Sequence, residues 1–154
     1  MGAYFAVDPF EYAALSFVPM ILAALVGNST VRYARLGAEE VLERGTVPIP
    51  PDGTPLPGGW VPRGSFQAVV VGSVNPRRLG ETLSALSGLT VPVLVAGRDL
   101  PIPIPNRYRD ASEAGADRLL NALAASRLWP GQGVVVLDFG TALSVSVVSP
   151  SVSL

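Results

Sequence analysis

The sequence of 154 residues contains no cysteine, no histidine and no lysine, since all 11 basic residues are arginine. The absence of cysteine excludes disulfide bonds and thiol nucleophiles. The absence of histidine excludes an imidazole base, a Ser-His-Asp triad and a histidine-ligated zinc. Without lysine, the chain can form neither a Walker A phosphate loop nor a Schiff base. Any chemistry must therefore depend on carboxylates, arginines, hydroxyls, backbone amides or a bound cation.

Charge is also scarce. Charged residues make up 15% of the chain, hydrophobic residues make up 49%, and the net charge is -1. This composition excludes a disordered, highly charged tail and provides enough apolar material for a hydrophobic core. No overall basic field is present to recruit nucleic acid or an anionic membrane surface. The length is typical of one domain and leaves little room for a second.

The longest apolar stretch covers residues 12–27 and raises the question of a membrane segment. It is shorter than the ~20 residues of a spanning helix, it contains Pro19, and no basic residue precedes it as in a signal peptide. We therefore divide the stretch at Pro19. Residues 20–26 are then a buried strand, residues 1–19 are an N-terminal extension, and Met20 can serve as a natural start. This interpretation predicts a cytoplasmic protein without a membrane partner.

Strands are predicted wherever the chain has a short apolar run or alternates polar and apolar residues. They cover residues 20–26, 31–36, 40–47, 68–71, 91–95, 133–137 and 144–149. Residues 48–64 hold six prolines and several glycines around Trp60, and they predict a loop. Three strands thus come first, strands then alternate with helices, and a new hairpin begins at the end of the chain.

Two helices are predicted between these strands. The first starts with Asn75 as its N-cap and Pro76 as its first residue. The second starts at Asp110 and Glu113, which have the spacing of a capping box, and runs to about residue 127. We expect the second helix to bury one apolar stripe, which consists of Ala116, Leu119, Leu120, Leu123 and Ala124.

Arg77 and Arg78 lie in the first turn of the first helix, where the helix dipole disfavours a cation. We expect both side chains to be solvated. Trp60 and Trp129 are interpreted as packing residues.

Two glycine turns are candidate phosphate loops. Each follows a buried strand and leads into another, with the sequences Val-Gly-Asn-Ser-Thr at 26–30 and Asp-Phe-Gly-Thr-Ala at 138–142. Glycine lets the backbone approach a ligand closely, and the adjacent amides and hydroxyls can donate to phosphate oxygens. Two such hairpins facing each other would clamp a phosphate. Taken singly, either turn is more commonly an ordinary β-turn.

The segment Gly115-Ala116-Asp117-Arg118 is a second candidate site. Asp117 could accept a proton from a hydroxyl, Arg118 could hold a carboxylate through two hydrogen bonds, and Gly115 would leave room for the substrate. Alternatively, Asp117 only complements the helix dipole and Arg118 is a surface residue. Tyr108 follows a rigid Pro-Ile-Pro segment and either lines a pocket or packs as a half-buried aromatic.

In combination, these motifs resemble the type III pantothenate kinases of the acetate/sugar kinase, heat-shock ATPase and actin superfamily. Four stretches are similar in the same order: residues 26–30, 69–76, 103–125 and 138–142. The third, with Pro-Ile-Pro and Gly-Ala-Asp-Arg-Leu-Leu-Asn-Ala-Leu-Ala-Ala, is highly specific. The resemblance covers about residues 20–149. It implies an α/β fold with a ribonuclease-H-like mixed β-sheet and flanking helices over residues 20–130, and the first strands of a second similar domain over residues 131–154.

The resemblance also implies an activity, namely transfer of the ATP γ-phosphate to the hydroxyl of pantothenate, which opens coenzyme A synthesis. It implies Mg²⁺, a monovalent cation (K⁺ or NH4⁺) and a homodimer. Phosphoryl transfer depends mostly on positioning and charge neutralisation, so it tolerates the absence of histidine, cysteine and lysine.

Site roles follow from the same resemblance. Asp117 would be the proton acceptor, Tyr108 and residues 115–118 would hold pantothenate, Asp138 would bind the monovalent cation, and Thr141 would contact ATP. The first phosphate loop would contact ATP through Leu25, Val26, Gly27, Asn28, Ser29, Thr30, Val31 and Arg32.

The sequence departs from the family pattern at several places. The family's first loop opens with aspartate, where this chain has Leu25. Its second loop continues with two threonines and later an aspartate, where Leu143, Ser144 and Ser146 stand. The proline-rich loop replaces a helix, and the chain ends before a complete second domain. Two alternatives to a kinase therefore stay open: a non-catalytic homologue with a binding or regulatory role, and a structural remnant without a ligand.

Overall fold

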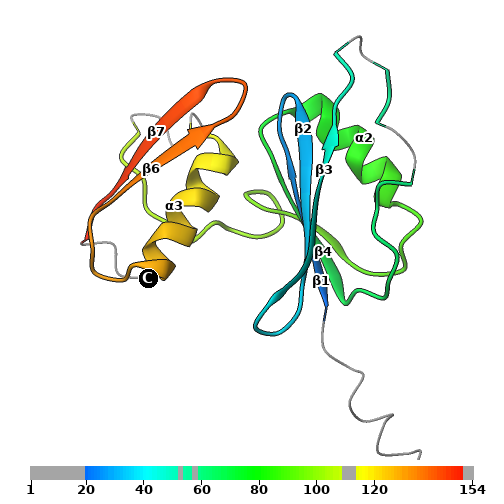
Figure 1. Ribbon diagram of the computed structural model, residues 1–154, viewed down its shortest axis with the longest axis horizontal. Helices are drawn as coiled ribbons and strands as arrows, with labels where there is room; N and C mark the ends of the chain where they lie inside the picture. The colour runs from blue at the N-terminus through cyan, green and yellow to red at the C-terminus, as the bar shows by residue number, and fades with distance from the viewer. Residues whose placement is uncertain (1–19, 52–53, 57–58, 109–113, 151–154) are drawn as a thin grey trace, which may run out of the picture.

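The computed structural model describes residues 20–51, 54–56, 59–108 and 114–150. These residues form a five-stranded mixed sheet, helices on its two faces and a separate two-stranded hairpin (Figure 1). The extension predicted at residues 1–19 and the capping pair predicted at Asp110 and Glu113 lie outside the described residues.

The five-stranded sheet has the order β3-β2-β1-β4-β5. Strands β1 (Ile21–Val26), β2 (Thr30–Leu36) and β3 (Val41–Pro48) form an antiparallel meander. Strand β4 (Ala68–Ser73) runs parallel to β1, and β5 (Val93–Val95) runs parallel to β4. This arrangement confirms the predicted ribonuclease-H-like mixed sheet with flanking helices. The last strand is shorter than predicted, because it begins at Val93 rather than at residue 91.

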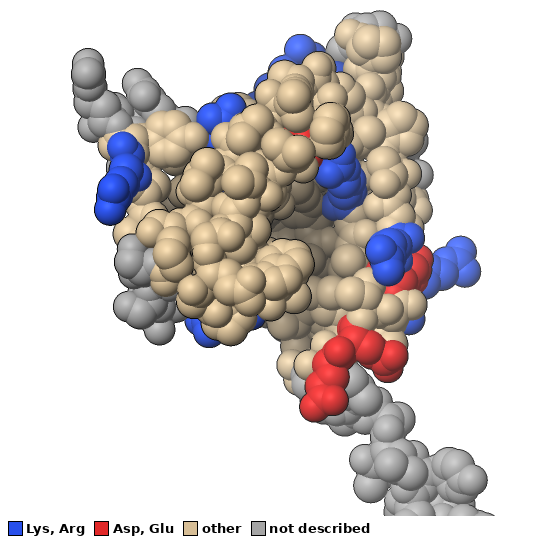
Figure 2. Space-filling view, turned by 60° about the vertical axis from the view of Figure 1, so that its left-hand side comes forward, with Lys and Arg blue, Asp and Glu red and all other residues tan. Residues whose placement is uncertain are grey.

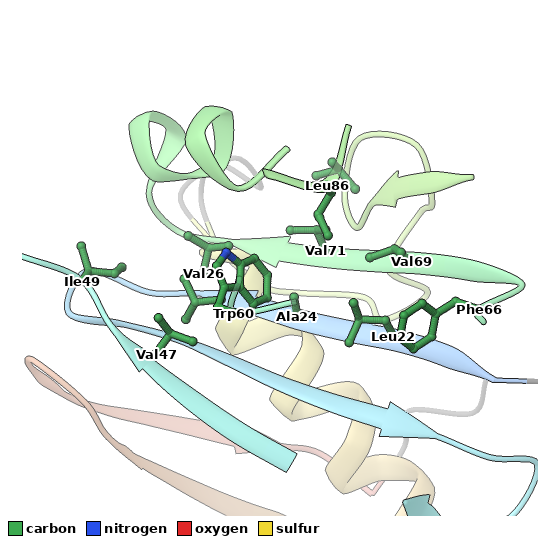
Figure 3. Close-up of a cluster of buried hydrophobic side chains, with 12 residues drawn as sticks. Leu22, Ala24, Val26, Val47, Ile49, Trp60, Phe66, Val69, Val71 and Leu86 are labelled. Atoms are coloured by element: carbon green, nitrogen blue, oxygen red, sulfur yellow. The ribbon is translucent and has the colours of Figure 1, made fainter. Parts of the chain in front are cut away.

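One face of the sheet carries the hydrophobic core. Since side chains alternate along a strand, Leu22, Ala24 and Val26 of β1 point to this face, and the residues between them point to the other. Trp60 and Phe66, from the connection between β3 and β4, join the side chains of the strands in this cluster (Figure 3). The rings of Trp60 and Tyr33 have centroids 6.2 Å apart. Trp60 is therefore a packing residue as expected, whereas Trp129 is exposed.

Helix α2 (Pro76–Leu86) covers the core face. It begins as predicted, since the side chain of Asn75 accepts a hydrogen bond from the backbone nitrogen of Arg78 at 3.1 Å and Pro76 is the first helical residue. The expectation that Arg77 and Arg78 are both solvated is wrong for Arg78. The side chain of Arg77 is 71% exposed, but Arg78 is only 6% exposed.

The buried guanidinium of Arg78 has partners in the proline-rich loop. Its Nη1 donates to the carbonyl of Thr54 at 2.9 Å and to Oε2 of Glu81 at 2.7 Å, and its Nη2 donates to the carbonyl of Pro50 at 3.0 Å. These hydrogen bonds and the carboxylate compensate for the loss of hydration, and they outweigh the unfavourable helix dipole. Arg78 thus anchors the loop to α2.

Helix α3 (Ala116–Leu128) covers the opposite face of the sheet (Figure 1). It begins at Ala116, later than predicted, with Gly115 as an N-cap that makes no side-chain hydrogen bond. The predicted apolar stripe is also partly wrong, because Ala125 is buried and Ala124 is exposed. The physical reason is that α3 lies between two neighbours, the sheet and the hairpin, so its contacts are not confined to one stripe.

The hairpin consists of β6 (Val134–Phe139) and β7 (Leu143–Val148), which pair antiparallel. It lies outermost in the molecule, with α3 between it and the sheet (Figure 1). None of the helices in the described ranges has the length and apolar content needed to cross a membrane.

Candidate functional site

A cleft of about 640 Å³ lies where three segments of the chain meet. They are the β1–β2 turn, the start of α3, and the end of β6 with the turn that follows it. The lining includes most of the residues for which a role was predicted, namely Leu25, Gly27, Asn28, Ser29, Thr30, Arg32, Gly115, Asp117, Arg118, Asp138 and Thr141. Their roles stay predictions, but the fold gathers them at one place.

The two glycine turns face each other across this cleft. Oγ of Ser29 in the first turn and Oγ1 of Thr141 in the second are hydrogen-bonded at 2.5 Å, although 112 positions separate them in the chain. The first turn is closed by a hydrogen bond of 2.9 Å from the amide of Gly27 to the carbonyl of Thr30. The two turns of the predicted phosphate clamp thus lie at one cleft and touch each other through their hydroxyls.

Val26 and Val31 do not line the cleft. Both side chains are fully buried in the core, because strand alternation directs them to the α2 face. The carbonyl of Val26 also accepts a hydrogen bond from the amide of Val74 at 3.1 Å. Val26 and Val31 therefore hold the predicted first phosphate loop against the core, and their side chains cannot contact a ligand in the cleft.

Leu25 lies on the cleft side of β1, between Arg32 of β2 and Gly72 of β4 in the strand register. Its side chain brings an apolar surface to the position where the resemblance implies an aspartate. A hydrocarbon group offers no lone pair to a cation and no charge to compensate for one.

The carboxylate of Asp117 is fixed beside Gly115. Its Oδ1 accepts a hydrogen bond from the backbone nitrogen of Arg118 at 2.8 Å. A Cβ atom on residue 115 would lie 2.6 Å from this oxygen, which is closer than real contacts allow. Glycine at position 115 therefore makes room for the Asp117 carboxylate. The sequence had predicted only that it leaves room for a substrate.

Arg118 lies between two cavities. It lines the cleft, and it also lines a second cavity of about 510 Å³ formed with residues 104–108, α3 and residues 145–149. Tyr108 lies in this second cavity, and its hydroxyl accepts a hydrogen bond from Nη1 of Arg118 at 3.0 Å. This hydrogen bond, followed by electrostatic attraction to Tyr108 and Asp117, raises the pKa of Arg118. The guanidinium is thus a permanent cation at the boundary of both cavities.

Asp138 lies at the end of β6 and brings a second carboxylate to the cleft. Its Oδ2 accepts a hydrogen bond of 3.4 Å from Nδ2 of Asn121. Asp138 is a suitable oxygen ligand for a monovalent cation. The fit to Mg²⁺ is poorer, because within the described ranges no group of three or more carboxylate, histidine or cysteine side chains could hold a metal ion. Mg²⁺ would have to be held largely by phosphate oxygens and water.

Asn75 is a residue of the site region that sequence reasoning treated only as a helix cap. Its Nδ2 donates to Oδ1 of Asn28 at 3.2 Å, while its own Oδ1 caps α2 through the Arg78 amide. The sequence carried a signal for this role. The residues Ser-Val-Asn-Pro directly follow the predicted strand, and they place a polar side chain at the carboxyl end of a parallel strand next to β1. Asn75 thus connects the first glycine turn to the start of α2.

The fold and the cleft define a class of protein: a ribonuclease-H-like domain with two glycine turns at one cleft. The comparison with protein families narrows this class. The model of the type III pantothenate kinases matches residues 21–153. The chain belongs to this family.

Individual relatives carry the same name. A type III pantothenate kinase of Sphingopyxis alaskensis is 32% identical over 144 residues, which cover 85% of this chain and 55% of the relative. One of Parafrankia sp. is 31% identical over 137 residues, 84% of this chain and 54% of the relative. One of Desulfovibrio desulfuricans is 48% identical over 59 residues, 38% of this chain and 22% of the relative. The chain thus spans about half the length of the first two relatives, and its match to the third is shorter.

Proposed function

We propose that this protein contributes the first domain of a type III pantothenate kinase, which phosphorylates pantothenate with ATP at the first step of coenzyme A biosynthesis. One observation carries the proposal beyond family membership: the Ser29–Thr141 contact closes two glycine turns around a cleft that also contains Asp117 and Arg118. One cleft thus contains hydrogen-bond donors that suit a phosphate, a carboxylate and a positive charge.

The phosphates of ATP would lie in the cleft between the glycine turns. The hydroxyl of Thr30 and the nearby backbone amides can donate hydrogen bonds to phosphate oxygens. Ser29 and Thr141 are bonded to each other, so one of these two hydroxyls still has its proton to donate, and both become donors only when phosphate replaces their contact. Arg32, on the cleft side of β2, adds a positive charge. Positioning and neutralisation of this kind are the main contributions that a protein makes to phosphoryl transfer.

Pantothenate would occupy the second cavity and reach the cleft past Arg118. Arg118 would hold its carboxylate, with Tyr108 orienting the guanidinium through the hydrogen bond described above. The pantothenate hydroxyl oxygen would then bond to the γ-phosphorus while the bond from that phosphorus to the ADP oxygen breaks. Asp117 would accept the proton that the hydroxyl loses. Ala116 begins α3 and lines neither cavity, so it would take part only through its backbone.

The cations belong to the proposal as well. Asp138 would bind K⁺ or NH4⁺ close to the phosphates. Mg²⁺ would neutralise phosphate charge. Because Leu25 stands where the resemblance implies an aspartate, the ion would have one carboxylate fewer near it. The division into an extension (1–19), a first domain (20–130) and the beginning of a second (131–154) is proposed on the same basis, as are a homodimer and a cytoplasmic location.

A measurement on a chimera tests the catalytic roles. The part of the Sphingopyxis alaskensis relative beyond its match would be joined to this chain, and ADP release would be followed with pantothenate, ATP, Mg²⁺ and K⁺. Asp117→Asn should lower kcat by ~10²–10⁴ while pantothenate still binds, because an amide keeps the shape but takes no proton. Arg118→Ala should raise KM for pantothenate more than it lowers kcat. Undiminished turnover of the Asp117→Asn chimera would contradict the assignment of the base.

Leu25 favours a second candidate function, a non-catalytic homologue that binds the ligands without turnover. We expect the chain by itself to show no measurable kinase activity and to bind Mg-ATP weakly. In the chimera, Leu25→Asp should raise activity, because the carboxylate restores an oxygen near the metal. Leu25→Asn is the control, with similar size and polarity but no charge. If the chimera with Leu25 is already as active as its Leu25→Asp variant, the turn acts through its backbone and hydroxyls alone.

A further inference from the structure

Asn75 lies between the end of β4 and the start of α2, and it lines neither cavity. Hydrogen bonds hold its backbone on both sides. Its amide donates to Oγ of Ser73 at 3.0 Å, and its carbonyl accepts from the same Oγ at 3.1 Å and from the amide of Leu79 at 2.9 Å. The side chain of Asn75 therefore starts from a well-defined backbone position.

The oxygen and the nitrogen of the Asn75 side chain cannot be exchanged. A backbone amide only donates, so the atom that faces the amide of Arg78 at 3.1 Å must be the oxygen, Oδ1. The nitrogen, Nδ2, is then the atom that faces Asn28 at 3.2 Å. Because this nitrogen also only donates, Asn28 must present its own Oδ1 to Asn75. The start of α2 thus determines which end of the Asn28 amide faces Asn75.

The orientation of its amide decides what Asn28 can offer to a ligand. Asn28 is exposed in the first glycine turn and lines the cleft. Its Oδ1 is bonded to Asn75, whereas its Nδ2 has no hydrogen-bond partner in the part of the chain that the structure describes. The group that Asn28 has left for a ligand is therefore a donor.

A donor at this place suits a phosphate. The oxygens of an ionised phosphate accept hydrogen bonds, so an amide oxygen in the same position would repel them. Figure 2 shows a hollow in one side of the molecule with positively charged side chains at its border, and the lining of the cleft includes Arg32 and Arg118. An anion that these charges attract needs donors as its close partners.

We propose that Asn75 is a positioning residue for ATP: it holds the Asn28 amide so that its nitrogen is free to donate to a phosphate group, an inference that rests on the proposed function. Asn75 acts through Asn28 and does not touch the ligand. The hydrogen bonds all run in one direction, from the Arg78 amide to Asn75, from Asn75 to Asn28, and from Asn28 to the phosphate. Hydrogen bonds in such a chain polarise one another.

The orientation of the Asn28 amide can be tested without a ligand. The side-chain amide of Asn28 in the whole chain would be observed by heteronuclear NMR and assigned through its loss in Asn28→Ala. Asn75→Asp keeps an oxygen for the Arg78 amide, but it offers Asn28 an acceptor in place of a donor. The Asn28 amide should then turn, and its proton resonances should move downfield because Nδ2 donates to the carboxylate. Unchanged resonances would overturn the proposal.

The role in binding is tested by titrating the whole chain with ATP and Mg²⁺ while the backbone amides of the first glycine turn are followed by NMR. Asn28→Ala should weaken binding about tenfold or more, because a hydrogen bond to a charged group is lost. Asn75→Ser still caps α2 but is too short to reach Asn28, so it should weaken binding about threefold to tenfold. Asn75→Asp should weaken it further. Tm should stay nearly constant in both variants of Asn75, because the cap is kept.

A double variant separates positioning from a general structural effect. In the Asn28→Ala background, Asn75→Ser should have no further effect on ATP binding, because no amide is left to orient. Equal effects of Asn75→Ser in the two backgrounds would overturn the proposal and leave the phosphate site in place. An unchanged affinity of Asn28→Ala would overturn it as well. If ATP does not bind to the chain at all, the proposed function fails together with the role of Asn75.

Discussion

The five-stranded sheet and the β6–β7 hairpin are built from similar residues but differ in what covers them. Valine, leucine and alanine occupy both faces of β1 and β4, and α2 and α3 cover the two faces. The hairpin has the same kind of sequence, but α3 covers only its inner face. A run of apolar residues thus indicates a strand that can be buried on both faces. It does not show how many of the two faces another element covers.

The largest expected effect contrasts the two regions directly. Leu22 in β1 is 0% exposed and Leu137 in β6 is 54% exposed. Leu22→Ala should lower the free energy of unfolding by ~2–5 kcal/mol, because it leaves a cavity in the core. Leu137→Ala in the chain alone should lower it by less than ~0.5 kcal/mol. Urea denaturation followed by circular dichroism measures both. Equal losses would show that the hairpin face is covered in this chain.

A smaller effect is expected from the loop that completes the core side of the sheet. Arg78→Met should lower the free energy of unfolding by about 2–3 kcal/mol, because the carbonyls of Pro50 and Thr54 and the carboxylate of Glu81 lose a buried donor. Arg77→Met is the matched control. Its side chain is 71% exposed and its ion pair with Glu81 spans 3.7 Å, so the change should be within ~0.5 kcal/mol. An equal effect of the two substitutions would refute the anchoring role of Arg78.

The smallest expected effect concerns residues 1–19. Strand β1 begins at Ile21, and the carbonyl of Met20 already accepts a hydrogen bond from the amide of Gln67 at 2.9 Å. A protein that starts at Met20 should therefore remain soluble and melt at the same temperature as the whole chain. Loss of soluble protein on this truncation would show that the five-stranded sheet depends on residues 1–19.

Local chemistry made the strands and the start of α2 predictable. Short apolar runs marked the strands, and Asn75 with Pro76 marked the helix start because both features act within a few residues. The start of α3 and the environment of Arg78 were not predictable in this way. Arg78 is buried by carbonyls of Pro50 and Thr54, more than twenty residues earlier in the chain, and no periodicity records such a contact.

The candidate site was predictable in its residue types but not in its geometry. Glycine turns, Asp117 and Arg118 could be selected from the sequence, and the family resemblance supplied their order. That Ser29 meets Thr141, or that Arg118 separates two cavities, follows only from the way α3 lies between the sheet and the hairpin. The burial of Val26 and Val31 follows from the alternation of side chains along a strand. The sequence alone could therefore have predicted that these two side chains do not line the cleft.

Gly72 of β4 leaves room for side chains from two neighbouring elements. A methyl group there would lie 2.7 Å from Cδ1 of Leu120 in α3 and 3.1 Å from Cδ1 of Leu25. Because both atoms are the far ends of flexible leucine side chains, an alanine at this position would turn these side chains aside rather than move the helix. Leu25 also lines the cleft, so the missing side chain at position 72 helps to decide where the apolar surface of Leu25 lies in it.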